Sequence, residues 1–430
     1  MKADKGKLRM VGRTDRLDSL NQNFTSDNNN LTILYGRHGI GKTTLIKEFV
    51  KDKNFFYYEA FQGAVFDVSR LDELYADGVN LFVFEEFHLL VKGNPGFMES
   101  VVSLLERHSK IMFVLACSSV AWVENSMVKS IGKSAFAINT FMKLKELNYS
   151  DFVYCFPNLE ADSMLKIYGI TGGNPAYISG WNGNKSIKDN ICSLFLKREG
   201  AFFNEAFNYV RDEFRETGVY NTILFCLSSG RNKLNEIHEY TGFGRDKISV
   251  YLKNLIAREI VEKIFSYDVK GSENTRKGLY RFKDGFLDFW YRFIYPHRDV
   301  LSICDASDFY DSYLATGLDD FYKNAFIKIA GEMLEIMNDM GRLPFYVSRK
   351  GSWYGKNGDI HLIFEDEDGN AIVGQVFEKK DNVTIDDFNR LVTNVGLAGI
   401  NVKHYFLFTA GAVDTAIIAD NVTIIGINDL

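Results

Sequence analysis

Proline is scarce in this chain, with five residues among 430, and no segment is rich in proline or serine. Linkers between domains are usually rich in such residues, so we expect the domains to follow one another through short connections. No run of about 18 apolar residues occurs, so no transmembrane helix is expected. The N-terminal sequence MKADKGKLRM lacks the apolar region of a signal peptide. A soluble cytoplasmic protein is therefore predicted.

Cysteine is equally scarce, and the five residues are scattered and odd in number. The sequence contains no CxxC spacing and no Cys/His cluster, so it does not indicate a zinc site. We therefore interpret the cysteines as reduced, buried thiols. They are Cys117, Cys155, Cys192, Cys226 and Cys304.

No excess of positive charge marks the chain, because the net charge is −6 and the pI about 5.8. A general affinity for nucleic acid is therefore not indicated, although a small domain could still carry a basic face. The hydrophobic share of 46% and the charged share of 25% are those of ordinary globular proteins. At roughly 100–200 residues per domain, the length predicts two to four domains.

A glycine-rich loop between a strand and a helix is the clearest motif. The apolar run LTILY (31–35) predicts a buried strand of a parallel sheet, GRHGIGKTT follows at once, and LIKEFV is helical in pattern. Gly36, Gly39 and Gly41 let the backbone curl so that its N–H groups point at phosphate oxygens. The start of the new helix adds a positive dipole end there.

Two side chains complete this phosphate loop. Lys42 is expected to reach the β- and γ-phosphates of a nucleotide, and the Thr43 hydroxyl can hold Mg²⁺. A chance GxxxxGKT is the alternative, but the flanking strand and helix disfavour it. The motif predicts binding of ATP with Mg²⁺.

A second apolar strand, LFVF (81–84), ends in two carboxylates. Acidic groups at the end of a buried strand are costly unless they serve a metal or a water. We expect Glu85 to hold Mg²⁺ and Glu86 to polarise the attacking water. The alternative is that both carboxylates cap the next helix.

A third strand, IMFVLA (111–116), leads into Cys117 and Ser118. A Ser118 hydroxyl placed between the phosphate loop and the acidic strand could sense the γ-phosphate. It could equally be the N-cap of the following helix.

Motifs along nearly the whole chain, in the same order, resemble a prokaryotic family of AAA-like P-loop ATPases with a C-terminal domain of uncharacterised function. The motifs are VGRTDRLDSL, GRHGIGKTT, LFVFEEF, LACSSVAWVEN, ITGGNPAYI, FKDGFLDFWYRFIYP and GSWYGKNGDIHLI. The resemblance implies that the sensor strand lies between the phosphate-loop strand and the acidic strand. It also implies that Val11, Gly12 and Arg13 lie by the adenine.

GGNP (172–175) would open a lid helix against the phosphates, although the residues alone indicate a turn followed by a helix that starts with Pro. The expected nucleotide contacts are Gly12, Arg13, Gly36, Gly39, Ile40, Gly41, Lys42, Thr43, Thr44 and Gly173, with Glu86, Lys42 and Ser118 as the catalytic set.

Two residues depart from the family pattern. Glu85 stands where Asp is usual, and Lys133, after Gly132, stands where Arg is usual. Lys133 offers a positive charge but cannot donate the two parallel hydrogen bonds that an Arg guanidinium donates. We therefore expect ATP binding with slow turnover.

The middle of the chain predicts a helical lid with a connecting helix (144–215) and then a winged helix-turn-helix (216–300). Three helical patterns precede two alternating strands. Arg245, Lys247 and Lys253 could contact DNA from the third helix. Because acidic residues dilute their charge, a structural spacer or protein-docking module is the favoured interpretation. The aromatic stretch FLDFWYRFIYP (286–296) could stack on nucleobases but more plausibly forms a buried junction.

The last third predicts long helices and then three strands, with a helix between the second and third strands, which together form an α/β core. By resemblance this is a restriction-endonuclease-like domain, whose Asp, Glu and Lys would gather Mg²⁺ beside a phosphate. The matching positions hold His361, Gln375 and Phe377, which cannot do so. Asp359, Glu378 and Lys380 could substitute only with a β-bulge in the second strand. We expect an inactive domain.

The sequence thus predicts an α/β protein with an ATPase core (1–143), a lid and connecting helix (144–215), a winged helix (216–300) and a degenerate nuclease-like domain (301–430). ATP binding with slow hydrolysis, used as a conformational switch, is the leading function. A non-hydrolysing, nucleotide-gated module that binds DNA or protein is the second, and an ATP-regulated nuclease the third. A homo-oligomer is compatible with these functions, because a neighbouring subunit could supply an arginine finger.

Overall fold

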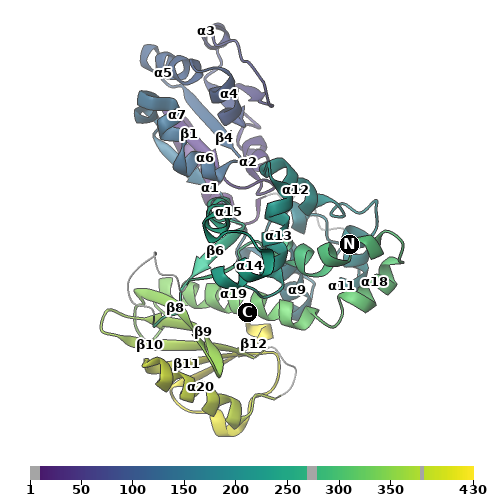
Figure 1. The fold of residues 1–430 in the computed structure, drawn as a ribbon. Coiled ribbons are helices and arrows are strands. Elements are labelled where there is room, and N and C mark those ends of the chain that lie inside the picture. Colours follow the sequence, from purple (N-terminus) through teal and green to yellow (C-terminus); the bar gives the residue numbers. More distant parts are fainter. Residues whose placement is uncertain (1–9, 269–277, 378–381) are drawn as a thin grey trace. The chain divides into compact units, whose positions relative to one another are not determined.

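The computed structural model describes residues 10–268, 278–377 and 382–430 (Figure 1). The chain divides into two compact units. What we call the N-terminal unit contains the described residues up to Leu147 together with Asn174–Ser179, and the C-terminal unit contains Asn148–Gly173 and Gly180–Leu430. Within the described ranges, no helix has both the length and the apolar character needed to cross a membrane.

The N-terminal unit is built on five parallel strands in the order β2-β3-β4-β1-β5. The expected position of β4 between β1 and β3 is confirmed. The sequence predicted β1, β3 and β4 but not β2 or β5, which form the two edges of the sheet. The strands are β1 (Asn30–Tyr35), β2 (Phe55–Glu59), β3 (Leu81–Glu85), β4 (Met112–Cys117) and β5 (Thr140–Lys143).

Helices cover both faces of this sheet because successive strand side chains point to opposite sides. Val83 and Val114 pack on one side with Leu20 of α1 and Ile46 of α2. Phe82, Phe84, Phe113 and Leu115 face the other core, which includes residues of α3, α4 and α5. The helices are α1 (Thr14–Thr25), α2 (Lys42–Phe49), α3 (Arg70–Ala76), α4 (Phe87–Gly93), α5 (Phe97–Arg107), α6 (Val120–Asn125), α7 (Met127–Ile131), the 3₁₀-helix η2 (Gly132–Ala137) and α10 (Pro175–Ile178).

The C-terminal unit begins with a helical region in which α9 packs against the long helix α19. The approach is close, because a side chain at Gly169 would meet Ala325 Cβ at 2.8 Å. The elements are α8 (Tyr149–Phe152), η3 (Val153–Cys155), α9 (Ala161–Thr171), α11 (Ile187–Ile191), η4 (Cys192–Leu196), α12 (Glu205–Glu213), α17 (Arg298–Leu301), α18 (Ala306–Tyr313) and α19 (Leu318–Asp339).

Three helices and an antiparallel strand pair follow α12, in the predicted order. They are α13 (Thr217–Ser228), α14 (Leu234–Thr241), α15 (Arg245–Ala257), β6 (Val261–Ile264) and β7 (Leu279–Phe282). The apolar face expected on α15 is buried at Ile248, Leu252 and Leu255, while Ile256 is half-buried. Arg245, Lys247 and Lys253 are exposed, as expected.

The aromatic stretch after β7 is buried, which confirms a packing role. It forms α16 (Gly285–Phe289), the π-helix η5 (Trp290–Ile294) and η6 (Tyr295–His297). Phe286, Phe289 and Trp290 are fully buried, and Phe289 packs edge-on against Phe321 of α19. Rings enclosed in this way are unavailable for stacking on nucleobases.

A mixed five-stranded sheet completes the C-terminal unit, in the order β12-β11-β10-β9-β8. The strands β8, β9 and β10 pair antiparallel, whereas β10, β11 and β12 pair parallel. Helix α20 covers one core, and α19 contacts β9 and β10. The sequence predicted β9, β10, α20 and β11 but not β8 or β12. The elements are β8 (Arg349–Gly355), β9 (Gly358–Glu365), β10 (Asn370–Phe377), α20 (Ile385–Ala398), β11 (Asn401–Thr409), η7 (Thr415–Ile417), β12 (Val422–Gly426) and η8 (Ile427–Asp429).

Candidate functional site

The glycine-rich loop lies at the carboxyl end of β1, between Tyr35 and Lys42, where α2 begins. Gly39 has φ +78° and Gly41, the residue before α2, has φ +95°. Only glycine adopts these left-handed conformations at no steric cost. The loop can therefore turn its backbone amides inward at the start of a helix, which is the arrangement that binds phosphate.

A segment from much later in the chain packs on this loop. The Ala176 amide donates to the Gly39 carbonyl at 3.1 Å, and Asn174 Nδ2 donates to the His38 carbonyl at 3.2 Å. A side chain at Gly39 would approach Ala176 Cβ to 2.9 Å. Asn174 caps α10, whose first residue is Pro175, so the expected turn and helix start are confirmed.

The Lys42 side chain is buried inside the loop. Its ammonium group donates to the carbonyls of Gly36 at 2.8 Å and Arg37 at 3.0 Å. Burial lowers the pKa of Lys42, while the negative charge of Glu86 opposes this shift. The loop carbonyls thus hold the cation within the loop.

Thr43 and Glu85, the two residues predicted as Mg²⁺ ligands, are in direct contact. The Thr43 hydroxyl donates to Glu85 Oε2 at 2.6 Å. The second carboxylate oxygen, Glu85 Oε1, is buried and has no hydrogen-bond partner among the described residues. A buried oxygen of this kind, beside a hydroxyl, fits a hard cation such as Mg²⁺. Thr44, the next residue of α2, is half-buried.

Burial raises the pKa of Glu85, although the hydroxyls of Thr43 and Tyr57 oppose the shift. The folded state therefore binds this proton more tightly than the unfolded chain, whose carboxyl titrates at about 4.3. Stability from this group is present below that pH and is lost as the pH rises through the raised pKa. At neutral pH the ionised carboxylate destabilises the ligand-free fold.

Glu85→Gln is therefore expected to stabilise the ligand-free protein at pH 7.5, with a smaller gain near pH 5. The glutamine carbonyl can still accept from Thr43 but carries no charge. Thermal unfolding at both pH values tests this, with Glu99→Gln, exposed on α5, as the control. A variant that is less stable than the unaltered protein at pH 7.5 would contradict the argument.

Glu86 and Ser118 meet at the carboxyl edge of the sheet. Glu86 Oε2 accepts from the Ser118 amide at 3.1 Å and from its hydroxyl at 2.7 Å. Glu86 occupies the N-cap position of α4 with φ +53°, but its side chain makes no capping hydrogen bond. The N-cap of α6 is Ser119 rather than Ser118. The Ser118 hydroxyl therefore orients the Glu86 carboxylate and does not cap a helix.

The residues expected near the adenine, Val11, Gly12 and Arg13, all belong to the N-terminal unit. Gly12 has φ +62°, and Arg13 Nη2 donates to the carbonyls of Lys145 at 2.5 Å and Ile40 at 3.3 Å. Ile40 is buried in the core beside the loop. Gly173, which was expected to contact the nucleotide as part of the GGNP segment, belongs to the C-terminal unit.

Two further side chains at this edge, those of His88 and Cys117, were not predicted as site residues from the sequence. His88 Nδ1 lies 3.4 Å from Glu86 Oε2 and 3.4 Å from Cys117 Sγ. Burial lowers the pKa of His88 and raises that of Cys117 to about 12. A histidine two residues after a glutamate at a strand end was the available signal, but its partner Cys117 comes from another strand.

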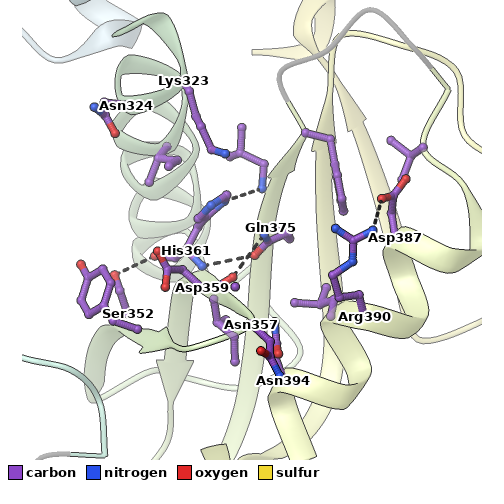
Figure 2. A pocket seen from close by; sticks show the side chains of 18 of the residues that line it. Lys323, Asn324, Ser352, Asn357, Asp359, His361, Gln375, Asp387, Arg390 and Asn394 are labelled. Atoms are coloured by element: carbon purple, nitrogen blue, oxygen red, sulfur yellow. Dashed lines mark hydrogen bonds and ion pairs between the residues drawn. The ribbon is translucent and has the colours of Figure 1, made fainter. Parts of the chain in front are cut away.

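A second candidate site is a pocket of about 670 Å³ in the C-terminal unit (Figure 2). The three positions expected from the nuclease resemblance, His361, Gln375 and Phe377, all line it, together with Asp359. His361 Nδ1 accepts from the Val376 amide at 3.1 Å, and Gln375 Oε1 accepts from the His361 amide at 3.2 Å. These bonds engage His361 Nδ1 and the side-chain oxygen of Gln375.

Burial lowers the pKa of His361 to about 3, so the imidazole is neutral. Asp387, another carboxylate of the pocket, is paired with Arg390 at 3.3 Å. Glu378 and Lys380, which were considered as substitutes, lie outside the described residues. The described part of the pocket is polar but shows no gathering of carboxylates for Mg²⁺.

The strand order and the glycine-rich loop define an α/β, P-loop-like unit, and the chain adds further helices and a mixed-sheet domain. Residues 290–385 match a family described as archaeal and bacterial proteins of unknown function. An uncharacterised protein of Methanocaldococcus jannaschii is 26% identical over 434 residues, which cover 90% of this chain and 95% of that protein. A second protein of that organism, named as an uncharacterised ATP-binding protein, is 42% identical over 48 residues, or 11% of this chain and 81% of its own.

Two solved structures are also similar to the chain. The Aeropyrum pernix ORC2 protein, in ADPNP–ADP complexes, has 14% identity and a TM-score of 0.41 over 70% of this chain and 94% of its own. The Thermotoga maritima RuvB Holliday junction branch migration motor has 12% identity and a TM-score of 0.35 over 62% of this chain and 91% of its own.

Proposed function

We propose that this protein binds ATP and hydrolyses it slowly with Mg²⁺, and that nucleotide binding acts as a conformational switch. The observation that carries the proposal is the contact of Thr43 with the buried Glu85 beside the glycine-rich loop. A hydroxyl and a carboxylate with one free oxygen are what an ATP-bound Mg²⁺ requires from a P-loop protein. The name of the M. jannaschii ATP-binding protein points the same way.

Each residue has a distinct role in this proposal. Lys42 would bind the β- and γ-phosphates and stabilise the charge that develops as the phosphoryl group leaves. Thr43 and Glu85 would hold Mg²⁺, whose charge neutralises the phosphates. Glu86 would orient the attacking water, and Ser118 would fix the position of Glu86.

We infer slow turnover from two departures from the family pattern, Glu85 and Lys133. Glu85 is one methylene longer than the usual Asp, so it shifts the carboxylate relative to the loop. Lys133 is exposed at the start of η2 and offers a single point charge where Arg would offer a fork. Positioning and charge stabilisation are the main sources of catalysis in phosphoryl transfer, so both changes act on the rate.

The direct test is to measure ATP binding and phosphate release by the purified chain, with and without DNA, and to determine the oligomer mass of the same sample. Mg²⁺-dependent phosphate release above background supports the proposal. ATP binding with no phosphate release supports a non-hydrolysing, nucleotide-gated module instead. Absence of ATP binding would refute both.

Ser118→Ala is expected to slow phosphate release about tenfold while changing ATP affinity less than about twofold. A hydrogen bond to a charged group contributes about 1.5–3 kcal/mol, and 1.4 kcal/mol corresponds to a factor of ten. The matched control is Ser119→Ala, because the Ser119 side chain makes no capping bond. Equal rates for both variants would show that the contact with Glu86 has no catalytic role.

We infer that α13 to α15 with β6 and β7 form a winged helix whose role is protein docking or spacing. The positive charge of α15 is offset by Asp246, which lies between Arg245 and Lys247. Arg245 is also hydrogen-bonded within the protein, because its Nε donates to Asn235 at 2.9 Å. Arg245→Ala combined with Lys247→Ala is therefore expected to change DNA affinity less than about twofold at fixed salt. A clear loss, with a smaller salt dependence, would instead identify a DNA-binding helix.

We also infer that the mixed-sheet domain is a restriction-endonuclease-like fold without nuclease activity. The support is chemical, because a neutral His361 and the amide of Gln375 stand where two carboxylates would be needed. Mg²⁺-dependent DNA cleavage that disappears in Asp359→Asn would overturn this inference.

A further inference from the structure

Three side chains of metal-binding types lie close together at the carboxyl ends of β3 and β4 and the start of α4. Glu86 follows β3, His88 lies in the first turn of α4, and Cys117 ends β4. One ligand atom from each residue lies within 4.8 Å of the other two. The three residues come from different elements, so only the fold brings them together.

Hydrogen bonds to other groups satisfy part of this cluster, since Glu86 Oε2 accepts from Ser118 and Cys117 Sγ donates to the Ser119 carbonyl at 3.7 Å, but they do not explain why both groups approach His88. Both Glu86 Oε2 and Cys117 Sγ approach the same ring nitrogen, His88 Nδ1, at 3.4 Å. A ring nitrogen carries either one proton or one lone pair, so it can make a single in-plane hydrogen bond. One of the two neighbours is therefore left without a bond to it, whichever tautomer is present.

A tetrahedral metal ion would satisfy all three atoms. Zinc binds carboxylate oxygen and imidazole nitrogen at about 2.0–2.2 Å and thiolate sulfur at about 2.3 Å, so neighbouring ligand atoms lie about 3.3–3.7 Å apart. Both separations measured from His88 Nδ1 fall in this range. The Ser118 hydroxyl already orients the Glu86 carboxylate, as outer-shell partners of metal ligands do.

We propose that Glu86, His88 and Cys117 form a site for zinc or a similar soft divalent ion, distinct from the expected Mg²⁺ ligands Thr43 and Glu85. Thiolate and imidazole select such ions, whereas Mg²⁺ prefers six oxygen ligands. Three protein ligands leave the fourth tetrahedral position to water. The Glu86 side chain retains partial exposure, which gives an ion access from solvent.

Binding converts the Cys117 thiol to a thiolate and releases its proton to solvent, while the neutral imidazole and the carboxylate bind without proton loss. Affinity for the ion therefore rises with pH. The ion also occupies the Glu86 carboxylate, which can then no longer orient water. Zinc should inhibit ATP turnover and leave ATP binding intact; this consequence rests on the proposed function, but the binding does not.

The test uses Zn²⁺ and Co²⁺ with the reduced 430-residue chain in the absence of nucleotide. Equilibrium dialysis should give one zinc per chain, and Co²⁺ should give the near-ultraviolet thiolate-to-metal band. Cys117→Ser and His88→Gln should each weaken zinc binding at least tenfold, and Cys117→Ser should abolish the cobalt band. Cys155→Ser, at a buried cysteine of the C-terminal unit, is the control.

Because a substitution could weaken zinc binding by disturbing the fold, two variants in different elements are used. The zinc affinity of each variant is interpreted only if its thermal unfolding transition matches that of the unaltered chain. Zinc affinity that is equal in the unaltered chain, Cys117→Ser and His88→Gln would overturn the proposal, as would less than one zinc per chain at micromolar zinc. If zinc binds as described but no ATP turnover exists to inhibit, the metal site stands and the ATPase proposal fails.

Discussion

Lys42→Ala is expected to weaken ATP binding about 100-fold, as measured by titration of the purified protein. The Lys42 ammonium lies inside the loop, bonded to the carbonyls of Gly36 and Arg37, where it would meet the phosphates. Each hydrogen bond to a charged group contributes about 1.5–3 kcal/mol, so losing even the weaker part of two such bonds reaches this magnitude.

The matched control for this variant is Lys47→Ala. Lys47 lies in the same helix, five residues later, but its side chain is exposed. It should leave ATP affinity unchanged within about twofold. If Lys42→Ala bound ATP as tightly as the Lys47 variant, the loop would not be a nucleotide site and the roles of Thr43, Glu85 and Glu86 would lose their basis.

Glu86→Gln is expected to retain ATP binding and to reduce phosphate release by a factor of roughly 10²–10⁴. The glutamine carbonyl can still accept from Ser118, so the local structure is preserved while the negative charge that polarises water is removed. Single-turnover phosphate release separates this effect from product release.

Glu99→Gln is a suitable control for that experiment, because Glu99 is exposed on α5. The contrast between Glu86→Gln and Lys42→Ala is also informative, since the first should slow hydrolysis without loss of binding and the second should weaken binding as well as slow hydrolysis. Unchanged phosphate release in Glu86→Gln would show that another group orients the water.

The sequence predicted the centre of the N-terminal sheet well because its signals are local. The strands β1, β3 and β4 are buried apolar runs that lead into chemically distinctive residues. The edge strands β2 and β5 were not predicted. Their side chains are only partly buried, with Phe55 and Phe141 exposed, so the patterns of these segments are not those of a core strand. These segments form strands because they pair with a neighbouring strand, and that strand lies elsewhere in the sequence, so local patterns do not reveal the pairing.

The same distinction applies to the site. Contact between Thr43 and Glu85 could be anticipated, because the carboxyl ends of parallel strands meet at one edge of a sheet. The cluster of Glu86, His88 and Cys117 could not, since no cysteine and histidine lie close together in the sequence with ligand spacing. The packing of Asn174 on His38 joins residues 136 positions apart, and the GGNP turn alone does not specify that partner.

The return of Asn174–Ser179 to the N-terminal unit has a consequence for the order in which the protein matures. During synthesis, all five strands of the parallel sheet emerge from the ribosome before this segment does. The carbonyls of His38 and Gly39 acquire their final partners only about 30 residues after the last strand, β5, has been made. A nascent chain halted just after β5 would carry the loop sequence without the segment that holds its far side. Contact of the glycine-rich loop with its final partners is thereby coupled to translation of the helical region that follows the sheet.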